Sequence, residues 1–310
     1  MILFAGIPSE GPLQMAIDAA DRLGLTHVVF NQRHSAHVDL QLDCGDHGVS
    51  GALWIGGTRH DLADFTGIYA RPVETAVLPE VQQRGRAGAD PAIVARTMAL
   101  GDLFTDLLDS ADMRVVNRPS AMGSNLSKPY QAQIVQRAGL LTPETLVSNR
   151  PDAVRRFRAE QGRIVYKSIS AVRSIVREWF PSKDDDLVAI TRLPTQFQGF
   201  VPGVNIRVHV VGATLFATEI MSEAVDYRYG DREGHDTAMV PVELPPDIAE
   251  ACVRLTADLG LWLSGIDLKR TPEGAWYCFE VNPSPAYSYF EELGGQPIAE
   301  ALVRLLAGRV

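Results

Sequence analysis

The first thirty residues constrain the fold more than any other segment, because they indicate a strand, a helix and a second strand in close succession. Met1 to Ala5 is an apolar run that ends at Gly6. Apolar residues then recur at helical spacing from Pro12 to Leu23, and His27 to Phe30 resumes a strand-like run. This order is typical of a βαβ unit, so we expect the chain to begin with an α/β domain.

The loop between the first strand and the helix does not match two common nucleotide-binding loops. Gly6 to Gly11 lacks the GxGxxG spacing of dinucleotide sites and the GxxxxGKS spacing of phosphate-binding loops. A nucleotide site, where one exists, must therefore be sought elsewhere in the chain.

The 310 residues exceed one typical globular core, so we expect several compact units. We predict an α/β domain over residues 1–114, a small α/β unit over 115–195 and a β-rich unit over 196–310. In the first unit we further expect strands at Ala52–Ile55, Gly67–Ala70 and Met113–Val116 and a helix at Pro91–Leu108. In the second we expect helices at Ser127–Gly139 and Pro151–Gln161 and strands at Thr145–Val147 and Ile164–Lys167. In the third we expect strands at Gln196–Val201, Asn205–Val211, Thr214–Met221, Trp262–Lys269 and Ala275–Val281 and helices at Asp247–Leu259 and Pro297–Leu306.

Composition narrows the class of protein. A net charge of -9 disfavours nucleic acid as a partner, because binding to phosphate backbones requires clustered Lys and Arg. Cys44, Cys252 and Cys278 are far apart and lack CxxC spacing, which indicates neither a disulfide framework nor a zinc ribbon. No apolar stretch approaches the roughly 20 residues that span a bilayer, and the start lacks the basic region of a secretory signal. We therefore expect no membrane partner and a cytoplasmic location.

Three oxygen-bearing side chains near the C-terminus form the strongest candidate site. Asp267 lies on one predicted strand, and Glu280 and Asn282 share a face of the next because they are two residues apart. Carboxylate and amide oxygens suit Mg²⁺, which commonly shares its ligand shell with substrate phosphates. The competing interpretation is that Asp267 and Asn282 merely end strands and Glu280 faces solvent. Glu280 lies inside an apolar run, so its charge requires an ion-pair partner, a metal ion or a solvent-exposed face.

An ordered set of short phrases resembles the ATP-grasp superfamily, in particular RimK-like ligases and the ligases that modify ribosomal peptides. The phrases span about residues 115 to 310. They are Asn117-Arg-Pro, Lys128, Thr142-Pro-Glu-Thr-Leu-Val-Ser, Val165-Tyr-Lys167, Phe197-Gln-Gly-Phe-Val, Asn205-Ile-Arg207, Asp226-Tyr-Arg228, Gly265-Ile-Asp267 and Phe279-Glu-Val-Asn-Pro-Ser-Pro. The resemblance implies an ATP-grasp fold, in which ATP lies between two α+β subdomains behind an N-terminal pre-ATP-grasp α/β domain.

The resemblance also implies a ligand set. Lys128 and Lys167 would contact the phosphates of ATP, and Asp267, Glu280 and Asn282 would hold Mg²⁺, with Mn²⁺ as an alternative ion. The hinge that meets the adenine would consist of Gln198, Gly199, Phe200 and Val201. Surface lysines and an ordinary buried strand are the competing interpretations of these residues.

Three arginines complete the candidate site. Arg207 and Arg228 match basic positions that, in similar enzymes, neutralise the γ-phosphate and the acyl-phosphate transition state. Arg71, in the loop after a predicted strand, would hold a substrate carboxylate. Structural salt bridges compete with each of these roles. His209, next to Arg207 on its strand, is interpreted as a residue that packs or supports the site from behind, with a direct role as the alternative.

Two segments depart from the family pattern. The loop after Lys167, residues 168–174, lacks the glycine-rich stretch of many relatives. Either the side chains of Ser168, Ser170 and Arg173 would contact phosphate instead, or the loop would close only when a substrate binds. The sequence after Glu280 lacks the glycine found in many relatives, which affects the geometry on the acceptor side.

The activity that the resemblance implies is carboxylate ligation. ATP would phosphorylate a carboxylate, and an amine or hydroxyl would displace phosphate to give an amide or ester. The carboxylate would belong either to a small molecule or to a peptide. The protein could also form a homodimer. The alternative is a catalytically silent ATP-binding scaffold of the same fold. The sequence contains neither the GxSxG motif of serine hydrolases nor the HExxH motif of zinc proteases.

Overall fold

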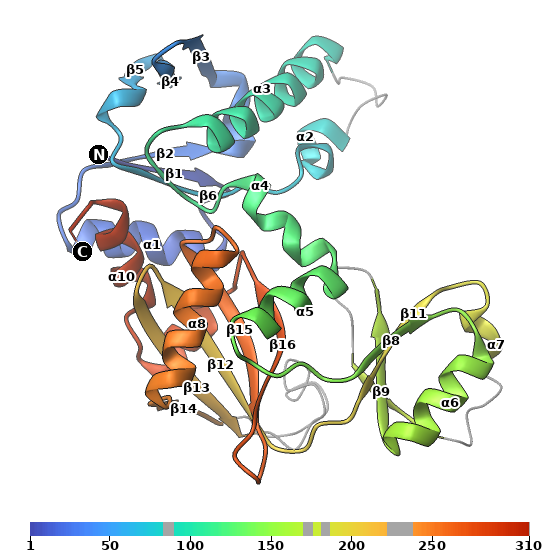
Figure 1. Cartoon of the computed structure of the whole chain (residues 1–310). Coiled ribbons are helices and arrows are strands. Elements are labelled where there is room, and N and C mark those ends of the chain that lie inside the picture. The colour runs from blue at the N-terminus through green and yellow to red at the C-terminus, as the bar shows by residue number, and fades with distance from the viewer. Residues whose placement is uncertain (83–89, 170–175, 181–186, 222–237, 310) are drawn as a thin grey trace.

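The computed structural model describes residues 1–82, 90–169, 176–180, 187–221 and 238–309. These residues form four β-sheets with helices packed against them (Figure 1). None of the described helices has the length and apolar character required to cross a membrane.

The N-terminal sheet is parallel and has the strand order β2-β1-β6-β7. Its strands are β1 (Ile2–Gly6), β2 (His27–Asn31), β6 (Gly67–Arg71) and β7 (Arg114–Val116). Ile2 and Phe4 of β1 pack toward helix α1 (Gly11–Arg22), and Leu3 and Ala5 pack toward α3 (Pro91–Ser110). Both faces are covered because successive side chains of a strand point to opposite sides. The predicted βαβ opening is therefore present.

An antiparallel three-stranded sheet is inserted between β2 and β6. It contains β3 (Val38–Gly45), β4 (Gly48–Ile55) and β5 (Thr58–Asp61). Only its Ala52–Ile55 portion was expected, because the other strands alternate short apolar residues with Asp, Gln and Gly. Short helical turns link this region to its neighbours: η1 (Gln32–His37), η2 (Leu62–Asp64), η3 (Thr75–Val77) and α2 (Pro79–Gln82).

The two ends of the chain share one hydrophobic core. Helix α10 (Ile298–Leu306), preceded by α9 (Ser288–Gly294), packs against α1 below the N-terminal sheet (Figure 1). Leu302 and Val303 of α10 are fully buried in this core together with Leu13 of α1. The third predicted unit therefore supplies part of the core of the first, which sequence periodicity alone does not reveal.

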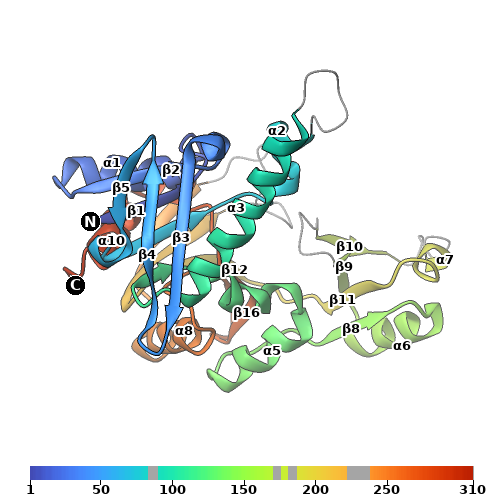
Figure 2. The same cartoon turned by 90° about the horizontal axis from the view of Figure 1, so that it is seen from above.

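The central unit is a small antiparallel sheet that projects from the rest of the molecule in both views (Figure 2). Its order is β10-β9-β11-β8. Helices α6 and α7 cover one face through the buried residues Val154, Trp179 and Phe197. The elements are β8 (Thr145–Ser148), α6 (Pro151–Gln161), β9 (Ile164–Ser168), β10 (Arg177–Trp179), α7 (Leu187–Ile190) and β11 (Thr195–Gly199).

The C-terminal sheet is antiparallel and has the order β14-β13-β12-β15-β16. Its apolar face packs against α5 and α8, and its other face carries the charged residues of the candidate site. The elements are α4 (Pro119–Met122), η4 (Gly123–Leu126), α5 (Lys128–Arg137), β12 (Val204–Val211), β13 (Thr214–Met221), β14 (Ala238–Val242), α8 (Pro246–Asp258), β15 (Leu263–Arg270) and β16 (Trp276–Asn282).

The predicted domain boundaries lie close to changes of sheet. β7 spans the first boundary, at residues 114 and 115, and pairs within the N-terminal sheet. β11 spans the second, at residues 195 and 196, and pairs with β8 and β9 of the central sheet. The boundaries themselves remain a prediction.

Candidate active site

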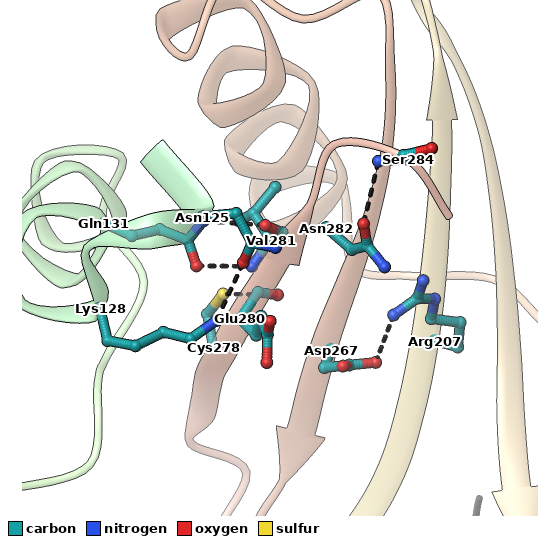
Figure 3. A network of polar contacts seen from close by, with 10 residues as sticks. All are labelled: Asn125, Lys128, Gln131, Arg207, Asp267, Cys278, Glu280, Val281, Asn282 and Ser284. Atoms are coloured by element: carbon teal, nitrogen blue, oxygen red, sulfur yellow. Dashed lines mark hydrogen bonds and ion pairs between the residues drawn. The ribbon is translucent and has the colours of Figure 1, made fainter. Parts of the chain in front are cut away.

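Three charged residues form a row across three adjacent strands (Figure 3). Arg207 of β12 lies opposite Asp267 of β15, which lies opposite Glu280 of β16. Directly opposed residues in an antiparallel sheet point to the same face, so the three side chains converge. Two residues along the strands, Gly265 lies opposite Asn282, so the predicted set of Asp267, Glu280 and Asn282 does gather on one face.

A β-bulge brings Glu280 to this position. Asp267 pairs with Glu280 and Leu268 pairs with Cys278, so Phe279 is an extra residue on β16. Bulges of this kind redirect side chains at the point where pairing shifts. As a result Phe279 and the carboxylate of Glu280 both lie near the edge of the sheet that meets α5.

Each carboxylate of the site is paired with a cation. Arg207 Nη1 lies 2.7 Å from Asp267 Oδ1, and Lys128 Nζ lies 2.5 Å from Glu280 Oε1. Asn125 Oδ1 accepts a second hydrogen bond from Lys128 Nζ at 2.9 Å. The side chains of Arg207 and Lys128 are only 8% and 11% exposed, so these pairs are shielded from screening by solvent.

The donor set fits a magnesium ion that shares phosphate ligands. Asp267 and Glu280 supply carboxylates, and Asn282 supplies an amide oxygen that already accepts the Ser284 N–H at 2.9 Å and keeps a second lone pair. In the part of the chain that the structure describes, no cluster of three or more His, Cys, Asp or Glu residues is suited to a metal. A pair of carboxylates with an amide is too small for a protein-only cage, but it suits Mg²⁺ completed by phosphate and water.

Arg207 is held from three sides. Besides Asp267, its Nε–H lies 3.4 Å from His209 Nε2, and its guanidinium lies 5.8 Å from the ring of Phe290. His209 is completely buried, and burial followed by the charge of Arg207 lowers the pKa of its imidazole well below the usual value. The neutral ring therefore accepts the Nε–H through Nε2 and carries its own proton on Nδ1.

Two side chains to which the sequence analysis gave no role in the site support β15, β16 and the loop that follows β16. Gln131 of α5 donates to Val281 O at 2.8 Å and accepts from Val281 N at 2.9 Å, which ties the helix to the residue between Glu280 and Asn282. The side chain of Asn117 bonds to the backbone at both Leu263 and Pro283. Neither contact leaves a sequence signal, because both partners are backbone groups far away in the chain.

The central sheet contributes its uncovered face. Lys167 and Val147 both lie opposite Gln196, and Gln198 lies opposite Thr145, so alternation puts their side chains on the face away from α6. A cavity of about 400 Å³ separates this face from α5 and β16. Residues that line it include Lys128, Thr145, Gln196, Gln198, Cys278 and Phe279. Lys128 and Gln198 are thus brought to one cleft, and buried Lys167 lies beside it.

The predicted hinge joins the two sheets. Gly199 N–H donates to Glu144 O, and Phe200 N–H donates to Arg163 O. Within the described residues, the Val201 N–H has no hydrogen-bond partner. The ring of Phe200 lies against the guanidinium of Arg163 at 3.7 Å. The hinge therefore has a fixed backbone and one N–H group directed to no protein acceptor among these residues.

Arg71 lies outside this cleft. Its guanidinium forms a bidentate pair with Glu10, at 2.9 and 2.7 Å, and donates to Pro285 O at 3.1 Å. It thereby links the N-terminal sheet to the loop that follows Asn282. Its role in binding a substrate carboxylate remains a prediction. Arg228, Ser170 and Arg173 lie outside the described residues.

No family model matches the chain. A protein of Ectopseudomonas mendocina (strain ymp) named "Probable alpha-L-glutamate ligase" is 23% identical over 250 residues, which cover 74% of this chain and 80% of that protein. A protein of the same name from Thioalkalivibrio sulfidiphilus is 21% identical over 253 residues, covering 75% and 81%.

Solved structures match almost the whole chain. Macrocyclase MdnC of Microcystis aeruginosa MRC, bound to precursor peptide MdnA, superposes with a TM-score of 0.78 at 22% identity over 99% of both chains. ATP-grasp ligase PsnB with minimal precursor, Mg and ADP gives a TM-score of 0.79 at 23% identity over 99% of this chain and 97% of that chain. A RiPP-associated ATP-grasp ligase of Chryseobacterium gregarium, with ADP and a leader and core peptide, gives 0.81 at 20% over 100% and 97%.

The fold of the chain is the ATP-grasp fold. The resemblance inferred from the sequence is therefore confirmed at the level of the fold, including the N-terminal α/β domain and the two following α+β subdomains. Macrocyclase MdnC was solved with a precursor peptide, ligase PsnB with a minimal precursor, and the Chryseobacterium gregarium ligase with a leader and core peptide.

Proposed function

We propose that this protein is an ATP-dependent ligase that activates a carboxylate of a peptide substrate as an acyl phosphate and joins it to an amine or hydroxyl. The observation that carries the proposal is the row of Arg207, Asp267 and Glu280, completed by Lys128, inside an ATP-grasp fold. Two facing carboxylates with two shielded cations fit a nucleotide that brings its own negative charge and a divalent ion.

The nucleotide is proposed to lie in the cleft between the central and C-terminal sheets. The Val201 N–H would donate to the base, and the ring of Phe279 would lie beneath it. Lys128 would shift from Glu280 toward the phosphates, because a compact ammonium on a flexible stem can follow a phosphate charge. Lys167 would reach the same phosphates from the opposite sheet.

The metal would be held by Asp267, Glu280 and Asn282, with Mn²⁺ as a substitute for Mg²⁺. When bound, it neutralises charge that develops on the transferred phosphoryl group. Arg207, fixed by Asp267 and His209, would stabilise the same charge and orient the acceptor carboxylate in line with the phosphoryl group. Arg228 is proposed to act beside it. No nucleophilic side chain is required, because the substrate carboxylate attacks the phosphoryl group directly.

A peptide is favoured over a free metabolite as the substrate because macrocyclase MdnC and ligase PsnB, which match this chain over nearly its whole length, were solved with precursor peptides. The nucleophile is proposed to be an amine or hydroxyl of the same peptide, which would give a product smaller than the substrate by one water per bond.

The decisive experiment incubates the protein with ATP, Mg²⁺ and short peptides encoded beside its gene, and follows ADP release and peptide mass together. We expect ADP release that depends on the peptide, with one water lost per ADP formed. ADP release without any loss of water would reject peptide ligation. Tight ATP binding without turnover of any carboxylate would instead support the catalytically silent scaffold.

A further inference from the structure

Lysine is rare in this chain, and its placement is selective. Of the 29 basic residues, 25 are arginine, and the four lysines are Lys128, Lys167, Lys183 and Lys269. Lys128 lines the proposed nucleotide cleft and Lys167 lies beside it, and Lys183 lies outside the described residues. A chain that uses arginine for nearly all its surface cations has thus kept lysine at two positions where a compact ammonium is useful. Lys269 remains to be explained.

Lys269 lies on the site face of β15. It is two residues beyond Asp267, so alternation points both side chains to the same side of the sheet. Its Nζ lies 5.8 Å from the ring centre of Phe200 in the hinge and 5.6 Å from that of Phe279 in the bulge. Within the described residues no carboxylate or hydrogen-bond acceptor is paired with this ammonium.

Packing alone does not account for a lysine here. The side chain of Lys269 is partly buried between two aromatic rings, and burial of an ammonium is unfavourable because the charge loses hydration. Cation–π contacts at such distances return only about 0.5–2 kcal/mol, and a methionine would fill the same space between two phenyl rings without desolvating a charge. An ammonium kept at this position therefore suggests an acceptor that the described residues do not provide.

The position of Lys269 indicates which part of a nucleotide it would meet. Lys269 is two residues from the proposed metal ligand Asp267, on the side toward the hinge. Two strand residues span roughly 6–7 Å. Phosphates bound at the metal would leave the sugar and base about this far along the strand, between Phe279 and the hinge residue Phe200.

We propose that Lys269 binds the nucleoside part of the nucleotide, donating hydrogen bonds to the ribose or to the purine edge and placing its charge beside the purine ring. This inference rests on the proposed function, because it assumes that the cleft binds ATP. Lys269 is then a binding residue for the nucleoside, distinct from the phosphate-binding pair Lys128 and Lys167.

The test measures the affinity of the full-length protein for ADP and for pyrophosphate, each with Mg²⁺, by titration calorimetry. The variant is Lys269→Met, and the matched control is Arg270→Met, which removes a cation from the neighbouring, exposed position. We expect Lys269→Met to raise the Kd for ADP about tenfold and to leave the Kd for pyrophosphate within twofold of the wild type. Arg270→Met should change neither value.

A rise in the Kd for ADP of less than fivefold would overturn the inference, and so would an equal loss of affinity for pyrophosphate, which would place Lys269 at the phosphates. Because the substitution removes a half-buried charge, the melting temperature without ligand should not fall; if it does, Lys269→Gln replaces Lys269→Met under the same criteria. Failure of the wild-type protein to bind ADP would reject the proposed function itself, a separate outcome.

Discussion

The guanidinium of Arg207 lies directly over Gly265 of the neighbouring strand. A Cβ atom built on Gly265 would approach Arg207 Nη2 to 2.1 Å and Pro285 Cβ to 2.7 Å. The absent side chain thus provides the space in which Arg207 turns toward Asp267. Gly265 and Asn282 are opposite each other, so this space lies beside the third proposed metal ligand.

Gly265→Ala is therefore expected to displace Arg207 without removing any charge from the site. Since Arg207 is proposed to act on the developing charge of phosphoryl transfer, kcat should fall at least tenfold while the Kd for ADP stays within about threefold. Steady-state ADP release and calorimetry measure the two quantities. Gly123→Ala is the control, because a Cβ there meets nothing within 4 Å and the backbone of Gly123 is helical. Unchanged kcat in Gly265→Ala would show that Arg207 is not used in catalysis.

Glu280→Gln tests the proposed metal ligand. The substitution keeps the size of the side chain but removes the charge that faces Lys128 at 2.5 Å, so we expect turnover to fall about 100-fold or more. The fold should persist because Lys128 retains its hydrogen bond to Asn125. Glu273→Gln, in the exposed turn between β15 and β16, is the matched control for loss of a carboxylate. Near-normal ADP release by Glu280→Gln, measured with saturating Mg²⁺, would contradict the assignment.

The sequence predicted that the three proposed metal ligands share one face, because strand alternation is a local property. The i, i+2 spacing of Glu280 and Asn282 determines their common face, and Asp267 follows once β15 and β16 pair. The sequence did not predict the bulge at Phe279 or the pairing of Arg207 with Asp267. Both depend on the register between strands, which is set by tertiary packing.

The same distinction between local sequence pattern and long-range packing holds for the fold. Helix α10 was recognisable from its apolar stripe, but its docking against α1 brings together segments almost 300 residues apart and has no periodic signal. The sheet of β3, β4 and β5 was largely missed, because its exposed strands alternate apolar residues with Asp, Gln and Ser. Local pattern thus predicts elements, whereas contacts between distant elements require the structure.

Asn117 offers a test of how the loop after the metal ligands is held. Its buried amide donates to Leu263 O at 2.7 Å and Pro283 O at 2.6 Å, and accepts from Trp262 N at 2.8 Å and Leu263 N at 3.2 Å. Asn117→Ala would leave these backbone groups unpaired, at a cost of about 3 kcal/mol in the free energy of unfolding.

Urea denaturation measures this loss, with Asn149→Ala as the control, because Asn149 is exposed. If Asn117→Ala lowered the free energy of unfolding by no more than Asn149→Ala does, the amide would not hold the two segments together. Because Pro283 directly follows Asn282, the Asn117→Ala protein should also bind ADP with Mg²⁺ more weakly than the control does.

His209 makes the stability of the protein depend on pH. The imidazole is buried beside Arg207, and both burial and that positive charge lower its pKa in the folded state. In the unfolded chain the pKa is about 6.5, so below this pH the unfolded state binds more protons than the folded state. The contribution of neutral His209 is therefore complete above about pH 6.5 and is lost as the pH falls toward the lowered folded pKa.

We expect the wild-type protein to lose up to about 1.4 kcal/mol per pH unit more than His209→Phe does between pH 6.5 and pH 5. Urea denaturation at pH 7.5, 6.5, 5.5 and 5.0 measures the difference. His47→Asn, which removes an exposed histidine, should keep the wild-type slope. Parallel slopes for the wild type and His209→Phe would show that His209 takes up a proton in the folded state and does not hold Arg207 as a neutral acceptor.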